Sequence, residues 1–194
     1  MGRAVSDPMT QTNQCSGEVP LAVWQLAADG SDASLRRRLA GRLVEGYLPD
    51  GGAVLDLVPG TGDLGHAVLD AGRAAVVMAD PGAGVGVRGF DGTFDLAVAL
   101  PPDADLAGGL YSPPEDALTR AAAALRPGGL LVSCLVGTEG GDPIGRAVSA
   151  ADGLGLRYIQ HVVALLSDGL PEQCSTGERR VAHADVLVFS KGRA

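Results

Sequence analysis

The chain has 194 residues, which suits one α/β domain with a short extension, and its formal net charge of −8 leaves no surplus of the positive charge with which proteins hold DNA phosphates. Hydrophobic residues make up 46% of the chain and aromatic residues only 4%, so the expected core is built from Val, Leu and Ala. No apolar run is long enough to span a membrane, and three widely spaced cysteines argue against a disulfide framework or a zinc site, so we expect no metal and a cytoplasmic protein.

The chain divides by composition after residue 33. Residues 1–33 are predicted to be an N-terminal extension, partly disordered because the first 18 or so are polar and mixed, and residues 34–194 form the predicted domain. From Ser34 to Tyr47, apolar residues recur at helical spacing, which predicts an amphipathic helix. Short apolar runs predict strands at 54–58, 74–79 and 94–100, with a helix at 64–70.

The second half of the chain continues the alternation. Ser112, Pro113 and Glu115 fit a capping box, which predicts a helix that begins there and ends at Leu125. Further on, the pattern predicts a strand at 130–136, a helix at 144–154 and two final strands at 158–166 and 185–189. We therefore expect an α/β fold with a mostly parallel sheet and one antiparallel strand near the C-terminus.

The most informative segment is VLDLVPGTG, from Val54 to Gly62. It reads as a buried strand, a tight turn and the start of a helix, and Asp56 lies at the strand end, where open α/β sheets bind ligands. Gly60 and Gly62 let the backbone approach a ligand that a Cβ would hold off. The spacing fits neither the dinucleotide-binding pattern nor a P-loop.

The segment resembles motif I of the class I S-adenosylmethionine-dependent methyltransferases, usually D-x-x-x-G-x-G. Other features are similar to the branch of this family that methylates amino groups of DNA bases, N6 of adenine or N4 of cytosine. They are AGR at 71–73, FDLAVAL running into Pro-Pro, the LRPGGLLV turn and the terminal HADVLVFSK. The resemblance covers residues 34–194 and implies a Rossmann-like sandwich with S-adenosylmethionine as the cofactor.

Carried over by position, the resemblance assigns candidate sites. The residues that would line the methionine end of the cofactor are Asp56, Pro59, Gly60, Thr61 and Gly62. Asp80, at the end of the second strand, would accept hydrogen bonds from the two ribose hydroxyls; a plain turn with Pro81 remains the alternative. Leu100, Pro101, Pro102 and Asp103 would occupy the catalytic motif.

The chain departs from the branch in that motif. Leu100 has no side-chain acceptor for a target amino group, and Asp103 has no ring to stack on a flipped base. Pro101 and Pro102 either contact the base or simply end a strand. Between Asp80 and Phe94 there is no room for the helix, strand and helix that the family has, so we expect a shortened sheet edge, and no target-recognition domain is visible.

Three functions stay open at this point. The first is a methyltransferase similar to the DNA methylases, or a relative that binds the cofactor. The second is an inactive pseudo-methyltransferase that acts as a binding or regulatory partner. The third is a small-molecule methyltransferase. For partners we expect S-adenosylmethionine or S-adenosylhomocysteine, no tight sequence-specific binding of DNA by the chain alone and no membrane; a protein partner or a homodimer is compatible with all three.

Other chemistry-bearing residues carry weaker signals. The cluster of Arg36, Arg37 and Arg38 is either a solvated helix face or a phosphate-facing patch. Cys134 is expected to be inert core, and Tyr111 to lie in a surface loop or over the pocket mouth. The three histidines are read as structural, because none has a metal-ligand partner at a suitable spacing; they are His66, His161 and His183.

Overall fold

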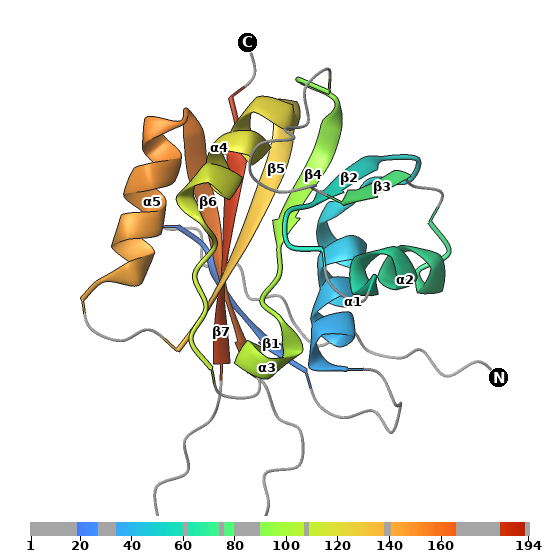
Figure 1. Cartoon of the computed structure of the whole chain (residues 1–194), viewed down its shortest axis with the longest axis horizontal. Helices are drawn as coiled ribbons and strands as arrows, with labels where there is room; N and C mark the ends of the chain where they lie inside the picture. The colour runs from blue at the N-terminus through green and yellow to red at the C-terminus, as the bar shows by residue number, and fades with distance from the viewer. Residues whose placement is uncertain are drawn as a thin grey trace, which may run out of the picture.

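The computed structural model describes residues 19–26, 34–59, 62–73, 76–79, 90–106, 109–137, 141–165 and 183–192. These residues form an α/β sandwich around a seven-stranded sheet of order β1-β6-β7-β5-β4-β2-β3 (Figure 1). The strands are β1 Leu21–Gln25, β2 Ala53–Asp56, β3 Val76–Ala79, β4 Phe94–Ala99, β5 Leu125–Val136, β6 Leu156–Leu165 and β7 His183–Lys191. The helices are α1 Leu35–Tyr47, α2 Asp63–Asp70, α3 Asp103–Leu106, α4 Glu115–Ala124 and α5 Pro143–Gly153.

The strand directions confirm the predicted sheet. Only β7 runs antiparallel to its neighbours β5 and β6, and every other pairing among the described strands is parallel. The carboxyl ends of β2, β4 and β5 therefore meet at one edge of the sheet, which is where ligands bind in open α/β folds. At the other end of the strand order, β3 is the outermost described strand, which agrees with the predicted shortened edge.

Strand alternation divides the core into two layers. Val54 and Leu96 face α1 and α2, whereas Leu55 and Ala97 face α4 and α5. All four are fully buried. Each fully buried Val or Leu contributes about 1.5–3 kcal/mol of transfer free energy, so the two aliphatic layers hold the helices against both faces without many aromatic rings.

One predicted boundary is wrong. Helix α4 begins at Glu115 with Pro114 at the N-cap, and no side chain caps it, so Ser112, Pro113 and Glu115 do not form a capping box. The physical reason is the pair of prolines. A residue that precedes a proline is disfavoured in the helical region, and both Ser112 and Pro113 precede one. The first helical residue is therefore Glu115, directly after Pro114.

Strand β1 lies in the segment that the sequence analysis set apart as an extension. It pairs parallel with β6, with Leu21 opposite His161 and Val23 opposite Val163. The sheet thus begins earlier than the predicted domain. Residues 1–18 and 27–33 lie outside the described residues, so the division of the chain and the partial disorder stay predictions. No helix in the described ranges is long and apolar enough to cross a membrane; the longest, α1, has 13 residues.

Lys191, the only lysine, lies at the end of β7 and caps the C-terminus of α4. Its Nζ donates to the carbonyl oxygens of Ala122 and Leu125, each at 2.7 Å, where the helix leaves carbonyls without intrahelical partners.

We predict that Lys191→Met lowers the free energy of unfolding by about 1–2 kcal/mol, because the methionine keeps the apolar stem but not the donor. Urea denaturation measures it. Arg157→Met, at a neighbouring exposed cation, is the control and should change stability by less than about 0.5 kcal/mol; equal effects would contradict the role of Lys191.

Candidate functional site

The site is built on the loop between β2 and α2. Asp56, the last residue of β2, is buried, and its Oδ1 accepts a hydrogen bond of 3.2 Å from the N–H of Val58. Gly62 precedes α2 with a φ of +82°, in the left-handed region that glycine adopts without strain. The chain therefore turns tightly from the strand into the helix N-terminus, as the sequence predicted.

A buried arginine reaches this loop from α1. Arg36 is 3% exposed, and its Nη2 donates to the carbonyl oxygen of Val58 at 2.5 Å. Its guanidinium nitrogens lie 3.9 Å from Oδ1 of Asp56 and 3.8 Å from Oδ2 of Asp63, the first residue of α2. One cation and two carboxylates thus meet at the carboxyl edge of β2.

The cluster sets one positive guanidinium against two carboxyl groups. Burial raises the pKa of Asp56 above its ordinary 3.8, and the Arg36 charge and the Val58 N–H only partly oppose this shift. The Nε of Arg36 is buried without a hydrogen-bond partner. A buried donor without a partner costs about 1–3 kcal/mol, so the site is arranged to receive a further acceptor. A guanidinium beside a carboxylate matches the two charges of an amino-acid zwitterion.

The segment after β4 closes the site from the other side. Strand β4 ends at Ala99, and the Pro102 carbonyl accepts from the N–H groups of Asp105 and Leu106 to start α3. The exposed Asp103 accepts a 3.1 Å hydrogen bond at Oδ1 from the backbone N–H of Arg36. Asp103 therefore joins α3 to α1 at the same place.

Tyr111 lies near this cluster at the end of β5. It forms a β-bridge with Val136, and its hydroxyl is buried without a partner. Burial, with a smaller contribution from Cys134, raises the pKa of Tyr111, so its hydroxyl stays neutral. It can donate one hydrogen bond and accept another.

Apart from Gly62, which precedes α2, the predicted site residues fall into four groups. Asp56 and Asp103 both contact Arg36, while Leu100 and Pro101 are buried in the core and Pro59 and Pro102 are exposed. Gly60, Thr61 and Asp80 lie outside the described residues. The assignment of all these residues to a cofactor or to catalysis stays a prediction.

Sequence reasoning missed Arg36 and Asp63. The solvated-face interpretation is wrong for Arg36, which is buried, but it holds for Arg37, whose Nη2 lies 2.6 Å from Asp70 Oδ2 in solvent. A signal was present in the sequence. Arg36 precedes the buried Ala40 and Leu43 at i, i+4 and i+7, so it continues the apolar stripe of α1.

The other candidates behave as structural residues. Cys134 is fully buried, and burial raises its pKa to about 12, so it remains a thiol in the core, as predicted. His161 contacts Asp185 Oδ1 at 2.9 Å, and His183 lies 3.7 Å from Oδ2 of the same carboxylate. Within the part of the chain that the structure describes, no group of His, Cys, Asp and Glu could hold a metal ion.

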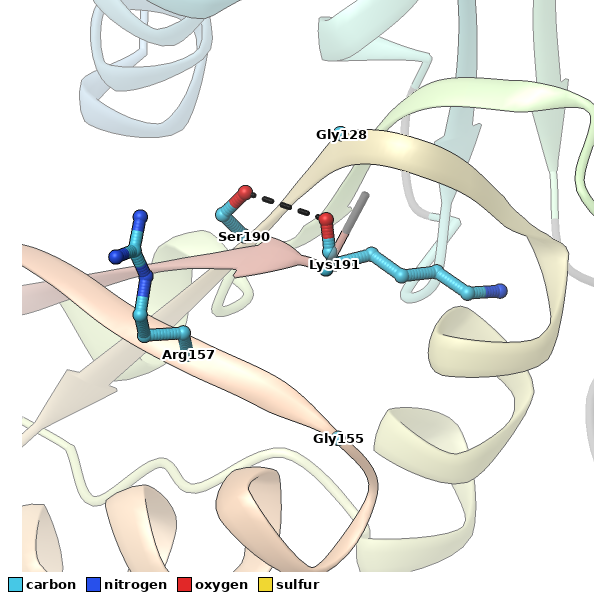
Figure 2. A pocket seen from close by; sticks show the side chains of 6 residues that line it. Gly128, Gly155, Arg157, Ser190 and Lys191 are labelled. Carbon is cyan, nitrogen blue, oxygen red and sulfur yellow. Dashed lines mark hydrogen bonds between the residues drawn. The ribbon is translucent and has the colours of Figure 1, made fainter. Parts of the chain in front are cut away.

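A separate cavity of about 570 Å³ lies at the opposite end of the sheet from Asp56. Figure 2 shows the side chain of Lys191 extending away from Arg157 and Ser190. The Lys191 ammonium is engaged by α4, so Arg157 supplies the charge on the cavity wall. The lining residues are Gly128, Gly155, Arg157, Ser190, Lys191 and Gly192. This cavity shares no residue with the Arg36 cluster.

Asp56 makes a testable contribution to pH dependence. Its folded-state pKa is raised above the unfolded value of 3.8, so the folded chain binds more protons between the two, and the free energy of unfolding falls as the pH rises through this window. Asp56→Asn keeps an oxygen for the Val58 N–H and removes the titration. We predict that the free energy of unfolding of the variant, relative to wild type, increases through the window and then levels off.

Urea denaturation across a pH series measures this difference. Asp70→Asn, whose side chain is 58% exposed, controls for the loss of one negative charge. A wild-type-minus-variant difference that stays constant with pH for Asp56→Asn would contradict the effect of burial on this carboxyl.

Comparisons with known proteins show the fold. No protein-family model matches the chain, and no curated protein matches it. Solved structures do match, at low identity. The [4+2]-cyclase SpnF is 16% identical with a TM-score of 0.52, and 84% of each chain is covered. A putative sarcosine dimethylglycine methyltransferase from Galdieria sulphuraria is 16% identical with a TM-score of 0.52, and covers 81% of this chain and 85% of its own.

A third structure is the complex of the Haloferax volcanii Trm112 methyltransferase activator with a putative methyltransferase. It is 13% identical with a TM-score of 0.52, and the match covers 84% of this chain and 100% of that chain. The fold is therefore the Rossmann-like fold of the methyltransferases, as predicted. At these identities the likeness establishes the fold alone, and none of these three structures is described as acting on DNA.

Proposed function

We propose that the chain binds S-adenosylmethionine at the carboxyl edge of β2 and is a methyltransferase. The observation that carries the proposal is the buried Arg36 guanidinium between Asp56 and Asp63, with an Nε that lacks a partner. The methionine part of the cofactor is a zwitterion. Its carboxylate suits the Arg36 guanidinium, and its ammonium suits the Asp56 carboxyl, because burial raises the pKa of Asp56 and a further cation beside it would oppose that shift.

The rest of the proposed site follows the motif. Gly62 leaves the turn open for the ligand, and Gly60, Thr61 and Pro59 are proposed to line it with backbone. Asp80 is proposed to accept from the ribose hydroxyls. A similar structure, the M. jannaschii TYW2, is described as a complex with AdoMet, which supports this choice of ligand.

When bound, the cofactor supplies a methyl group on a sulfonium, which transfers by in-line attack. The chain contributes alignment and exclusion of water, which account for most of such an acceleration. Of the residues after β4, Leu100 and Pro101 are buried and apolar and offer no side-chain base, so Asp103 carries the carboxylate of the predicted catalytic motif. Two polar groups are proposed to orient an acceptor: the Tyr111 hydroxyl, which is buried without a partner, and the Asp103 carboxylate.

The first experiment tests the cofactor. Calorimetric titration of the chain with S-adenosylhomocysteine should show binding. Arg36→Lys should weaken it about tenfold, since lysine keeps the charge but loses the planar fork and the Nε donor. Arg37→Lys is the matched control: the same change one residue away, on a side chain 36% exposed to solvent, should leave the affinity unchanged.

The titrations distinguish absence of binding, binding at another place and loss of the fold. Absence of binding by the wild-type chain would overturn the proposed function. Binding that Arg36→Lys and Arg37→Lys weaken equally would place the ligand elsewhere. Urea denaturation of both variants shows whether a loss of affinity reflects a loss of fold, because the affinity change is interpreted only where stability is retained.

A second candidate function is a non-catalytic cofactor-binding protein. The observation that favours it is the burial of Leu100 and Pro101 where the resemblance puts the groups that hold a target amino nitrogen. The two functions differ in one readout. Under saturating cofactor, a methyltransferase transfers the labelled methyl group from the sulfonium to an added acceptor and releases S-adenosylhomocysteine, whereas the binding protein releases the cofactor unchanged.

DNA as the acceptor is disfavoured by charge. The net charge is −8, and Arg36, one of the three arginines of the 36–38 cluster, is buried and engaged with carboxylates. We predict that the chain alone shows no nanomolar, sequence-dependent binding of duplex DNA at about 150 mM salt. Fluorescence anisotropy with random and genomic duplexes is the measurement. Tight binding that depends on sequence would restore the DNA methylase interpretation despite the altered motif.

A further inference from the structure

Strand β1 has an open edge of regular backbone. It is the terminal strand of the sheet and pairs only with β6 among the described strands (Figure 1). The Pro20 carbonyl accepts from His161, and the Leu26 N–H donates to Leu165, so the even-numbered residues point their backbone groups at β6. Because these groups alternate between the two edges of a strand, Leu21, Val23 and Gln25 direct theirs outward.

The same residues carry an exposed apolar surface. Leu21 is 60% exposed and Val23 is 59% exposed, which places both among the few large apolar side chains exposed on the described surface. The alternate residues face inward, where Trp24 packs beside Tyr47 with their ring centroids 6.1 Å apart. One face of β1 is thus anchored in the core, and the other is bare.

Within its described residues, β1 lacks the charges, prolines and bulges that usually protect an edge strand. Soluble proteins block open edges with lysines, prolines, bulges or a covering element. The sequence LAVWQ has no charged residue and no proline, and its register against β6 is unbroken. An uncharged strip on a chain of net charge −8 is also where two equally charged copies meet with the least repulsion.

We propose that β1 pairs antiparallel with β1 of a second copy, which joins the two sheets across a two-fold axis at Val23. In this register Val23 faces its own counterpart and Leu21 faces Gln25 of the second copy. Each facing pair exchanges both N–H···O bonds, since all three residues present their backbone groups at the open edge.

A second copy fits better than an unrelated strand because β1 is complementary to itself. A two-fold interface requires one surface to match its own reverse, and a centre at Val23 satisfies the backbone donors and acceptors on both sides at once. It also covers the exposed Leu21 and Val23 side chains by cross-strand contact. The paired strands have five residues each, so the interface is small and we expect a dissociation constant in the micromolar range.

Sedimentation equilibrium of the full chain, from about 1 µM to about 500 µM, tests the dimer in the range expected for a small interface. Val23→Lys places two like charges face to face at the axis and should raise the dissociation constant about tenfold or more. Leu69→Lys is the matched control, because Leu69 is 73% exposed on α2 and undergoes a similar apolar-to-lysine change. It should leave the dimer intact.

A charge-swap pair tests the register. Leu21→Lys alone should weaken the dimer, and the double variant Leu21→Lys with Gln25→Glu should recover it, because the antiparallel register sets each lysine opposite a glutamate of the second copy. Hydrogen exchange on the wild-type chain gives an independent readout. The amides of Leu21, Val23 and Gln25 should gain protection as the concentration rises.

Three results would overturn the proposal. The first is a wild-type chain that stays monomeric over the whole concentration range. The second is a dimer that Val23→Lys and Leu69→Lys affect equally. The third is protection of the odd-numbered β1 amides that does not change with concentration, which would mean that another segment of the same chain covers the edge. None of these measurements involves the cofactor.

Discussion

The structure of the candidate site depends on one buried guanidinium. Arg36 joins α1 to the Val58 carbonyl, to Asp56 at the end of β2 and to Asp63 at the start of α2, while its backbone N–H holds Asp103 of α3. Burying such charges carries a desolvation cost that the ion pairs do not reliably offset, so this cluster is a poor device for stability alone. The ligand proposed above would complete this arrangement.

The topology of the sheet explains why the cluster forms there. Chain order runs outward from β2 to β3, then returns to the other side of β2 to form β4. The connections after β2 and β4 therefore leave in opposite directions, and open α/β sheets bind ligands at such a switch point. Asp56 and the segment from Leu100 to Asp103 are the residues that the two strands deliver to it. Helix α1 contributes Arg36, which contacts Asp56 at the same place.

Local patterns predicted most of the fold. The apolar run ending in Asp56, the Gly-rich turn and the helix after it are short-range features, and the structure confirms them. Sequence patterns failed to predict features that depend on contacts with residues far away in the sequence. Arg36 is buried only because carboxylates from β2 and α2 meet it, and β1 is a strand only because β6 lies beside it. Neither partner is visible from the local sequence. The capping box failed for a local reason, since the helix-breaking effect of Pro114 on Pro113 outweighs the Ser112 signal.

The fold alone does not determine which reaction a protein catalyses; the residues at the site do. A similar structure is described as a [4+2]-cyclase, so the same sandwich serves reactions other than methyl transfer. What distinguishes this chain is the pairing of a charged half, built by Arg36, Asp56 and Asp63, with an apolar half, where Leu100 and Pro101 fill the end of β4. The charged half suits the ionic end of an amino-acid ligand. Leu100 and Pro101 supply neither a base nor a stacking ring, so within the proposed function an acceptor beside them would depend on its own nucleophilicity and on alignment. We infer that such a site suits an exocyclic amine held within a nucleic-acid helix less well than a small acceptor that carries its own lone pair.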